Sequence, residues 1–435
     1  MFEVIDKANA KKVLLLVPPT YGHVYPMIEL GNYLIQLGLK VTIGVSSCYI
    51  PLLKEKAGSL LDQFLLLGFQ DTYTVEVGFN DDTINELCDS VENFFYHSEN
   101  FFDLVIVESF LSATISTTKK FTKILCLLVT TSGQRFIKLK SNQSYPDFIK
   151  KVKFHLIDEL ENKKNLNYVL ISSFEGLEKN FFETYKSQLD CYNCPFKFIG
   201  PLGAYSRQMQ NVKPSNNLQP PYTQLGQYLD SKKDKSVIYI SFGSCGYISE
   251  KQVREIALAL LEFKCCFVWS CKTELLSNLT EEIRISLNNL GLCLEWAPQV
   301  TAHSQSLTPK KLFILSHKAI AFYLTHTGWN STCEALEKGI PMLCWPLEAD
   351  QHENADLLVN LKVAHLIPGT RDASTMKGPD GEGDGRLVPH EELAAKFKYM
   401  FDELEVYSAE ARKYIKLSQE AASNGKEFLL SVVIN

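Results

Sequence analysis

The sequence lacks the features that mark secreted, membrane-spanning and nucleic-acid-binding chains. Its 435 residues include 44 Lys and Arg against 50 Asp and Glu, so the net charge of −6 gives no basic excess to attract nucleic acid or an anionic membrane. No run of about 20 apolar residues is present that could cross a bilayer. Residues 1–12 have no apolar segment of the kind found in signal peptides. We therefore expect a cytoplasmic protein without a membrane segment or a nucleic-acid partner.

Disulfide bonds are not expected to hold the fold. Most of the twelve cysteines stand singly in apolar runs, as Cys126 and Cys344 do, which is typical of buried and reduced thiols. Cys191 and Cys194 form a lone CxxC with no second pair, so the pattern gives little reason to expect a zinc or redox site.

Two successive series of strands and helices predict the fold. In the first half, Val13–Val17 is typical of a strand buried on both faces, Met27–Leu37 has helical spacing, and Val41–Val45 is a second strand. In the second half, Val237–Ser241 and Glu250–Glu262 begin the same alternation again. The sequence therefore predicts an α/β protein with two facing Rossmann-like, doubly wound domains and a ligand cleft between them.

The stretch 206–222 separates the two series. It contains Pro, Asn and Ser without hydrophobic periodicity, which is typical of a linker. We expect an N-terminal domain over 1–205 and a C-terminal domain over 223–410. The last residues, 411–435, are expected to form a helix that packs back on the N-terminal domain.

The most informative segment runs from residue 296 to residue 351. It holds Trp296-Ala297-Pro298-Gln299, then Thr325-His326-Thr327-Gly328-Trp329-Asn330-Ser331, then Glu334, and finally Asp350-Gln351. Further motifs precede it, namely Gly22-His23-Val24-Tyr25-Pro26, Ser172–Glu178, Ile199–Leu202 and Tyr239–Ser244. In this order the motifs resemble the plant-type family 1 UDP-dependent glycosyltransferases, which act on small molecules and have the GT-B fold. The resemblance spans the whole chain.

The resemblance implies a nucleotide-sugar site in the C-terminal domain. A strand ending at Leu324 is followed by a Gly-containing turn and a helix expected over Ser331–Lys338, and the N-terminus of such a helix suits a diphosphate. By resemblance, phosphate oxygens would be contacted by His326, Asn330, Ser331 and Ser244.

The same resemblance assigns the rest of the donor site. Trp296, in one motif with Ala297, would stack on uracil. Gln299 and Glu334 would bind the ribose, and Asp350 and Gln351 would bind the sugar hydroxyls. Trp329 would line the sugar site through its backbone, and Thr131 matches a family position that touches the sugar. Gln at position 351 implies glucose as the transferred sugar.

No metal and no cofactor are expected, with UDP-glucose acting as a co-substrate. The chain contains no Asp-x-Asp, the motif by which many transferases hold a nucleotide sugar through a divalent metal. A helix N-terminus and side-chain donors would instead stabilise the leaving diphosphate.

The acceptor hydroxyl needs a general base, and His23 is the natural candidate. His23 follows the first strand, where the family keeps its catalytic histidine, and a carboxylate usually orients such a ring. The family pattern places an Asp just after the strand Leu104–Val107, whereas this chain has Glu108. We predict that Glu108 pairs with His23.

The chain departs from the signature in length. Trp296 and His317 lie 21 positions apart, where the family has about nine. The extra residues fall within Thr301–Phe313 and are polar, which predicts a surface loop that can be removed without unfolding the protein.

The acceptor itself is expected to be small and lipophilic. Its pocket would be built by the segments Tyr73–His97 and Gln134–Lys153, which contain several aromatic residues, among them Phe94 and Phe95. A monomer is expected.

The favoured hypothesis is inverting transfer of a sugar from a UDP-sugar to an acceptor hydroxyl. One alternative is an epimerase or hydrolase that acts on the UDP-sugar itself. A second is a catalytically impaired nucleotide-sugar binder, which Glu108 and the extra segment would explain. A third, a nicotinamide dehydrogenase, needs a Gly-x-Gly-x-x-Gly after a first strand, and neither half has one.

Overall fold

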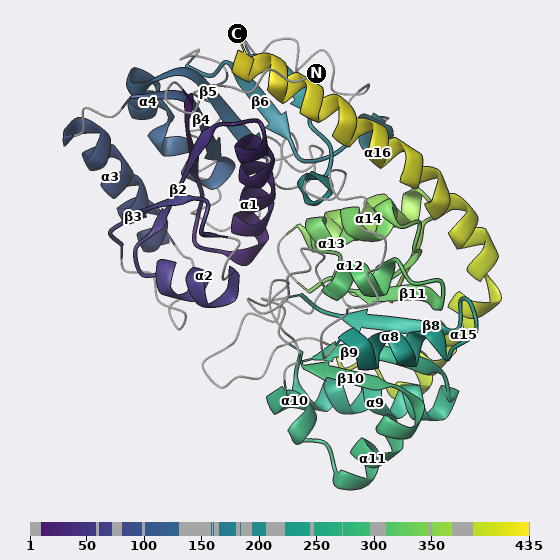
Figure 1. Ribbon diagram of the computed structural model, residues 1–435. Helices are drawn as coiled ribbons and strands as arrows, with labels where there is room; N and C mark the ends of the chain where they lie inside the picture. The colour runs from purple at the N-terminus through teal and green to yellow at the C-terminus, as the bar shows by residue number, and fades with distance from the viewer. Residues whose placement is uncertain are drawn as a thin grey trace. The chain divides into compact units, whose positions relative to one another are not determined.

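The chain divides into two compact units (Figure 1). One comprises Met1–Asn211 with Leu417–Asn435, and the other comprises Val212–Lys416. The computed structural model describes residues 10–57, 61–71, 81–97, 101–129, 158, 160, 165–179, 183, 194–205, 222–243, 248–271, 273–295, 310–347, 350–367 and 386–434. Most of the expected linker, 206–221, therefore lies outside the described residues.

The first unit is built on a seven-stranded sheet in the order β3-β2-β1-β4-β5-β6-β7, and every described strand pair is parallel. The strands are β1 (Lys12–Leu16), β2 (Lys40–Ser46), β3 (Leu65–Phe69), β4 (Phe102–Glu108), β5 (Thr122–Val129), β6 (Tyr168–Ile171) and β7 (Phe196–Phe198). The helices are α1 (Tyr21–Gln36), α2 (Ile50–Ala57), α3 (Asp81–His97) and α4 (Ile115–Thr118), with short 3-10 turns at η3 (Ser109–Thr114), η4 (Lys119–Phe121) and η6 (Leu202–Ala204).

Strand β1 shows why this sheet is buried on both faces. Val13 and Leu15 belong to a cluster that includes residues of α1, while Leu14 and Leu16 belong to a second cluster that includes residues of α3. Successive side chains of a strand point to opposite faces, so a continuous apolar run supplies both clusters. Helix α1 begins at Tyr21, six residues before the predicted Met27, and its first turn holds the exposed Gly22 and the half-buried His23 as well as the buried Val24.

The second unit has a six-stranded sheet in the order β10-β9-β8-β11-β12-β13, also with parallel pairs only. The strands are β8 (Val237–Ser241), β9 (Cys266–Cys271), β10 (Leu292–Glu295), β11 (Ile320–Thr325), β12 (Met342–Cys344) and β13 (Ala364–Leu366). The helices are α8 (Tyr222–Asp230), α9 (Glu250–Phe263), α10 (Thr273–Ser277), α11 (Glu281–Leu290), α12 (Lys310–Leu315), α13 (Trp329–Glu337), α14 (Gln351–Asn360), α15 (His390–Asp402) and α16 (Leu404–Ile434).

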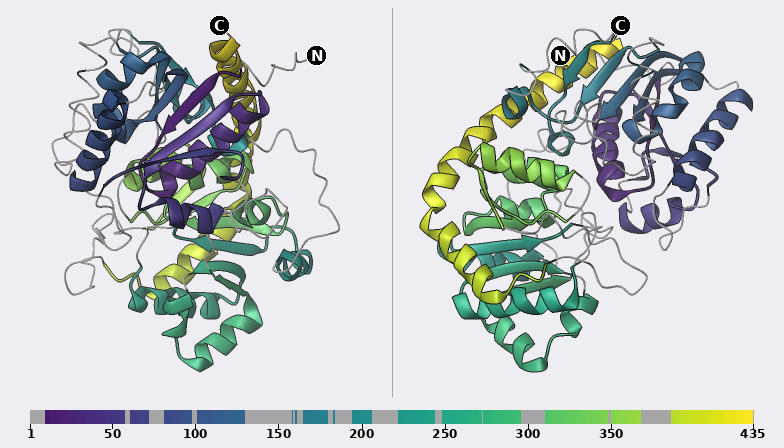
Figure 2. Two further views of the ribbon diagram at one scale, coloured as in Figure 1. Left: turned by 60° about the vertical axis from the view of Figure 1, so that its left-hand side comes forward. Right: turned by 180° about the vertical axis from the view of Figure 1, so that it is seen from behind.

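The last helix, α16, is a single helix of 31 residues (Figure 2). Its residues from Leu417 onward belong to the first unit. There Ala422, Leu429 and Val433 join the cluster that contains Val13 and Leu15. The Nζ atom of Lys426 donates to the carbonyl of Tyr205 at 2.7 Å, which ties this helix to the end of η6.

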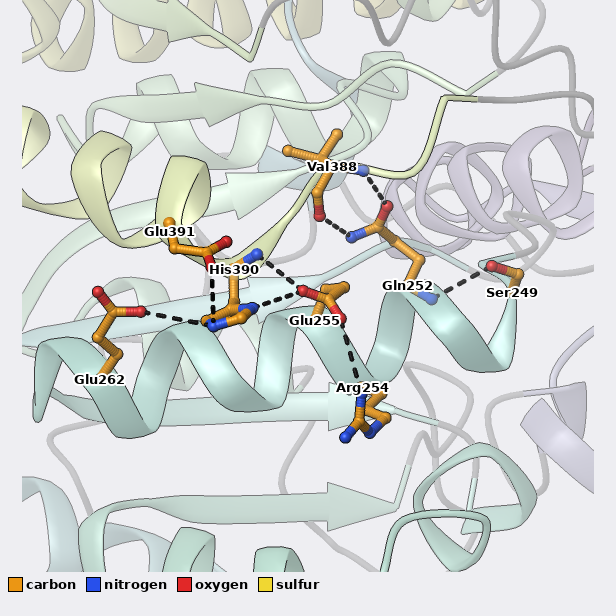
Figure 3. A network of polar contacts seen from close by, with 8 residues as sticks. All are labelled: Ser249, Gln252, Arg254, Glu255, Glu262, Val388, His390 and Glu391. Atoms are coloured by element: carbon orange, nitrogen blue, oxygen red, sulfur yellow. Dashed lines mark hydrogen bonds and ion pairs between the residues drawn. The ribbon is translucent and has the colours of Figure 1, made fainter.

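Helix α15 is tied to α9 by a polar network (Figure 3). The amide of Gln252 donates to the carbonyl of Val388 at 2.9 Å and accepts from its N–H at 2.8 Å, so both buried backbone groups are satisfied. Nδ1 of His390 lies 2.7 Å from Glu255, and the hydrogen bond between them raises the pKa of the histidine. Ser249 caps α9 by accepting from the N–H of Gln252 at 3.2 Å.

Both sheets have a point where the strand order reverses, and the candidate residues lie there. In the first sheet β1 and β4 are neighbours, and His23 and Glu108 stand at or just after their carboxyl ends. In the second sheet β8 and β11 are neighbours, and His326 directly follows β11. Parallel α/β sheets bind ligands at such switch points, so each unit presents one candidate position. The predicted α/β class with two doubly wound parallel sheets is confirmed.

Candidate active site

The first unit brings His23 and Glu108 together. His23 lies in the first turn of α1, and Glu108 is the last residue of the neighbouring strand β4. The Nδ1 atom of His23 is 3.0 Å from Oε1 of Glu108. The ring of Phe110 meets the histidine ring edge-on, with the centroids 4.9 Å apart, and fixes its orientation from another side. The pairing predicted from the sequence therefore exists as a direct contact.

Glu108 is held in place by more than the histidine. Oε1 also accepts from the hydroxyl of Ser109 at 2.8 Å, and Oε2 accepts from the N–H of Phe110 at 2.9 Å, which caps the 3-10 turn η3. Complete burial would raise the pKa of Glu108, but His23 and these donors outweigh it and hold the pKa below its ordinary value. The carboxylate is thus buried, ionised and immobile.

This geometry selects one form of the His23 ring. A neutral imidazole that donates to Glu108 carries its proton on Nδ1, so the lone pair that can take a proton is on Nε2. The side chain is 24% exposed while Glu108 is fully buried. A second proton on Nε2 would give an imidazolium beside a fixed negative charge. The pair can therefore take up a proton at Nε2 of the histidine.

In the second unit, His326 directly follows β11, and the backbone at Gly243 and Gly328 passes close to its ring. A Cβ atom at Gly243 or at Gly328 would approach Nε2 of His326 to 2.5 or 2.6 Å, so only glycine at both positions leaves room for the ring. Nδ1 has no hydrogen-bond partner among the described residues. Burial and the nearby Lys311 lower the pKa of His326 to about 3. The ring is therefore neutral at physiological pH.

Helix α13 carries the next predicted residues. It runs from Trp329 to Glu337, two residues ahead of the expected start, because Gly328 stands in extended conformation and begins the helix without a side-chain cap. Trp329, Ser331 and Glu334 are buried, and Asn330 is half-buried. A helix start of this kind presents backbone N–H groups and the positive end of the helix dipole.

Lys311 of α12 reaches the same helix. Its Nζ atom donates to Oγ of Ser331 at 2.5 Å and lies 2.8 Å from Oε2 of Glu334. Both charged side chains are almost fully buried. Burial alone would lower the pKa of Lys311, but the carboxylate of Glu334 raises it above its ordinary value. The lysine is therefore a cation inside the site.

The turn after β11 also fixes the start of α14. Thr327 has a φ of 63°, and its hydroxyl donates to the carbonyl of Gln351 at 2.8 Å. The amide of Asn354 donates both to the carbonyl of Thr327 and to Oδ2 of Asp350, at 3.0 Å each. Oε1 of Gln351 accepts from the N–H of Leu347 at 2.8 Å. Asp350 and Gln351 are thus held beside the turn that carries His326.

The remaining predicted residues, Thr131, Ser244, Trp296, Ala297 and Gln299, lie outside the described residues. Within the described part of the second unit, the structure gathers His326, Ser331 and Glu334 around one helix start. Asp350 belongs to the same group, because its charge acts on the pKa of His326.

The extra segment Thr301–Phe313 is not a polar surface loop over its last four residues. Residues 310–313 belong to α12, and Lys311 and Leu312 are buried at 7% and 1% exposure. The prediction was wrong because Lys at 310 and 311 suggested exposure, whereas a buried carboxylate on α13 accepts one of these charges. Residues 301–309 lie outside the described residues.

The expectation for Tyr73–His97 is corrected at Phe94 and Phe95, whereas residues 73–80 and the segment Gln134–Lys153 lie outside the described residues. Residues 81–97 form helix α3, and Phe95 is fully buried in the core against Phe121, with ring centroids 5.1 Å apart. Phe94 packs against Phe69 at 5.7 Å. These aromatic side chains fill the core of the first unit instead of lining a pocket, because α3 presents its apolar face to the sheet.

Two buried polar residues beside the predicted site residues of the second unit were missed. Asn354 is fully buried and joins Thr327 to Asp350, a role that only the turn geometry reveals. Lys311 gave no signal of a buried role, because a lysine in a polar stretch is typical of a solvated surface.

The described residues contain neither a metal-binding cluster nor a membrane-spanning helix. No three His, Cys, Asp or Glu side chains of this part of the chain gather closely enough to hold a metal ion. None of its helices combines the length and the apolar character needed to span a membrane.

Comparison with known sequences identifies relatives of the chain. Residues 127–370 match the family model described as "UDP-glucoronosyl and UDP-glucosyl transferase". The chain is 28% identical over 396 residues to UDP-glycosyltransferase 74B1 of Arabidopsis thaliana, covering 79% of this chain and 81% of that protein. It is 32% identical over 234 residues to 7-deoxyloganetin glucosyltransferase of Gardenia jasminoides, covering 51% and 45%. The match spans about half of the length of several of these curated relatives.

Solved structures share the fold. The structure of UGT71G1 of Medicago truncatula complexed with UDP-glucose matches with a TM-score of 0.72 at 18% identity, covering 98% of this chain and 99% of that one. Os79 of O. sativa in complex with UDP matches with a TM-score of 0.71, covering 97% and 100%. The two-sheet architecture therefore matches that of plant glycosyltransferases of the GT-B fold. Since the family model covers more than half of the sequence, this chain belongs to the UDP-glucoronosyl and UDP-glucosyl transferase family.

Proposed function

We propose that this protein transfers a sugar from a UDP-sugar to a hydroxyl of a small lipophilic acceptor, with inversion at the anomeric carbon. Glucose is the proposed sugar. The observation that carries the proposal is the contact between His23 and the buried Glu108 at 3.0 Å. A hydroxyl is a weak nucleophile at neutral pH, and a histidine held by a carboxylate is suited to take its proton as the new bond forms. Family membership supports the UDP-sugar as the donor.

The second unit would hold the donor. His326, Asn330 and Ser331 at the start of α13 offer donors to the diphosphate, and Glu334 offers a carboxylate to the ribose. Asp350 and Gln351 at the start of α14 would bind the sugar hydroxyls. Ser244, Trp296, Ala297, Gln299 and Thr131 are proposed for the same site on the resemblance alone. Names of relatives point the same way, since one is a glucosyltransferase and one solved structure contains UDP-glucose.

We also propose that the reaction needs no metal and no cofactor. The leaving diphosphate would be stabilised by the start of α13 and by neighbouring side-chain donors. Turnover is expected to persist in EDTA. Complete loss of activity in EDTA, restored by Mg²⁺ or Mn²⁺, would contradict this part of the proposal.

Release of UDP tests the function directly. The purified chain is incubated with UDP-glucose, with and without a panel of phenolic acceptors, and both UDP and glycoside are measured. Release that depends on an acceptor and matches glycoside formation supports transfer. Release without any acceptor, or formation of an epimer, would instead show hydrolysis or epimerisation. Binding of UDP-glucose without turnover on the panel would indicate a nucleotide-sugar binder.

A further inference from the structure

A lysine is buried at the start of α13, where two of the proposed donor-binding residues lie. Its Nζ atom is 2.5 Å from Oγ of Ser331 and 2.8 Å from Oε2 of Glu334. The side chains of Lys311 and Glu334 are 7% and 5% exposed. Nζ also lies over the ring of Tyr323, 5.4 Å from its centroid. These contacts with described residues lie on β11 and on the first turns of α13.

Stability alone gives a weak reason for this arrangement. Removing two charges from water costs several kcal/mol, and a buried ion pair is often no better for stability than apolar residues of the same volume. A leucine at position 311 would continue the apolar pattern of α12, whose Leu312, Ile314 and Leu315 are buried. A function of the charge itself accounts better for the lysine.

The charges around α13 show what that function is. Glu334 and Asp350 are acidic, and His326 is neutral because its pKa is about 3. Lys311 is therefore a cation beside this helix start, where it forms an ion pair with Glu334. A nucleoside diphosphate brings negative charge to the same place, and a buried cation attracts it far more strongly than an exposed one.

The hydrogen bond from Lys311 to Ser331 fixes the direction in which the serine hydroxyl can donate. The N–H of the ammonium group occupies a lone pair of the serine oxygen. The hydroxyl hydrogen of Ser331 therefore points toward a different acceptor. Ammonium groups only donate, so the lysine keeps Ser331 in the role of a donor, which is the role that a phosphate oxygen requires.

We propose that Lys311 is a positioning residue of the nucleotide site, which turns Ser331 toward the diphosphate of the donor and supplies the positive charge beside it. The inference rests on the proposed function, because it takes a uridine diphosphate sugar as the ligand. It assigns a role to the segment by which this chain is longer than its family signature. Lys311 holds Glu334 through the same ammonium group, so the ribose and phosphate positions are linked through one side chain.

The test compares ligands that differ only in phosphate. Affinities of UDP, UMP and uridine are measured by calorimetry, with displacement titrations for the weak ligands, for the wild type and for Lys311→Gln. Gln can still donate to Glu334 but has no charge. UDP affinity is expected to fall about 10- to 100-fold, the range for a lost charge-assisted hydrogen bond. Uridine affinity is expected to change by less than about threefold.

The matched control is Lys318→Gln. Lys318 lies just beyond α12, is 68% exposed and pairs with Asp234 at 3.0 Å on the surface, so its loss should leave all three affinities unchanged. An equal loss for UDP and uridine in Lys311→Gln would overturn the inference, since it would show a general collapse of the site. Unchanged UDP affinity would overturn it as well.

A second variant keeps the test decisive if Lys311→Gln does not fold. Lys311→Arg keeps the charge opposite Glu334 but presents a planar, longer head to Ser331, so UDP should weaken more than uridine. Arg with wild-type affinity for both ligands, or with equal losses, would overturn the role of Ser331. If the wild type itself binds no uridine nucleotide, the proposed function fails, and the inference fails with it for that separate reason.

Discussion

His23 and Glu108 form a pair in which only the histidine reaches solvent. Nδ1 of the ring lies 3.0 Å from Oε1 of the carboxylate, and the side chains are 24% and 0% exposed. The carboxylate is fixed by Ser109 and by the N–H of Phe110, so the ring takes its orientation from a rigid partner. A histidine held this way can accept a proton on its exposed side without moving.

Replacing His23 by Ala should lower kcat by about 100- to 10,000-fold, the usual contribution of a positioned general base. UDP affinity should stay within about twofold, because the residues proposed to contact the uridine and the diphosphate belong to the other unit. The measurements are steady-state kinetics with UDP-glucose and calorimetry with UDP. His365→Ala, on strand β13, is the matched control and should keep wild-type kcat. A His23→Ala enzyme with wild-type kcat would remove the base from the mechanism.

Replacing Glu108 by Gln should lower kcat to a similar extent, because the amide keeps the shape but no longer favours a proton on Nδ1 or an imidazolium. The double variant His23→Ala, Glu108→Gln should be no slower than His23→Ala, since both changes act on one proton transfer. Glu108→Asp keeps the charge and should retain more activity than Glu108→Gln. Additive losses in the double variant would mean that Glu108 acts independently of the histidine.

UDP-glucose should be preferred over UDP-galactose, UDP-xylose and UDP-glucuronate. Gln351 is buried at the start of α14, and its Oε1 accepts from the N–H of Leu347, so the side chain is held in one orientation. Hydroxyl recognition by a fixed amide discriminates epimers through unpaired hydrogen bonds. Competition among the four donors gives the ratios of kcat/KM, and a higher value for any of the other three would contradict the assignment.

Acid should destabilise the second unit through His326. Its pKa in the folded state is about 3 against 6.5 for the free side chain, because burial and Lys311 disfavour the imidazolium. Between these values the unfolded chain binds the extra proton, so stability falls as the pH drops below 6.5. The slope from this residue is at most about 1.4 kcal/mol for each pH unit.

Urea unfolding of the wild type and of His326→Gln between pH 7 and pH 4 measures this effect. The variant has no group to titrate at this position, so its stability should decline less steeply with acid. Parallel curves for the two proteins would show that the buried ring is not the acid-sensitive group.

The sequence indicated both sheets because their strands carry an unmistakable pattern. Val13–Val17 and Val237–Ser241 are continuous apolar runs, and such runs form strands that are covered on both faces. The third strand, Leu65–Phe69, is also a largely apolar run, but it lies at a sheet edge and most of its side chains are exposed or only partly buried; the short β7 is an edge strand as well.

The motifs alone placed His23, Glu108 and His326 beside the correct strands. A motif that follows a strand is located by the strand, because parallel strands end at one edge of the sheet. The spacing between Trp296 and His317 also indicated an extra segment, but it did not indicate that the last residues of this segment are buried. A lysine pattern resembles that of a solvated surface, and nothing in the local sequence names its partner 23 positions away, Glu334.

The sequence by itself determined the class of fold, the family and the kinds of residue that follow the strands β1, β4 and β11. These properties depend on patterns within short segments, because the burial of each segment and its turn residues are encoded locally. Only the tertiary structure decided that Glu108 reaches His23 despite its extra methylene, and that Lys311 is buried against Ser331 and Glu334. Such contacts join residues that are far apart in the chain. Their distances depend on how the helices pack on the sheets, and no local sequence pattern encodes that packing.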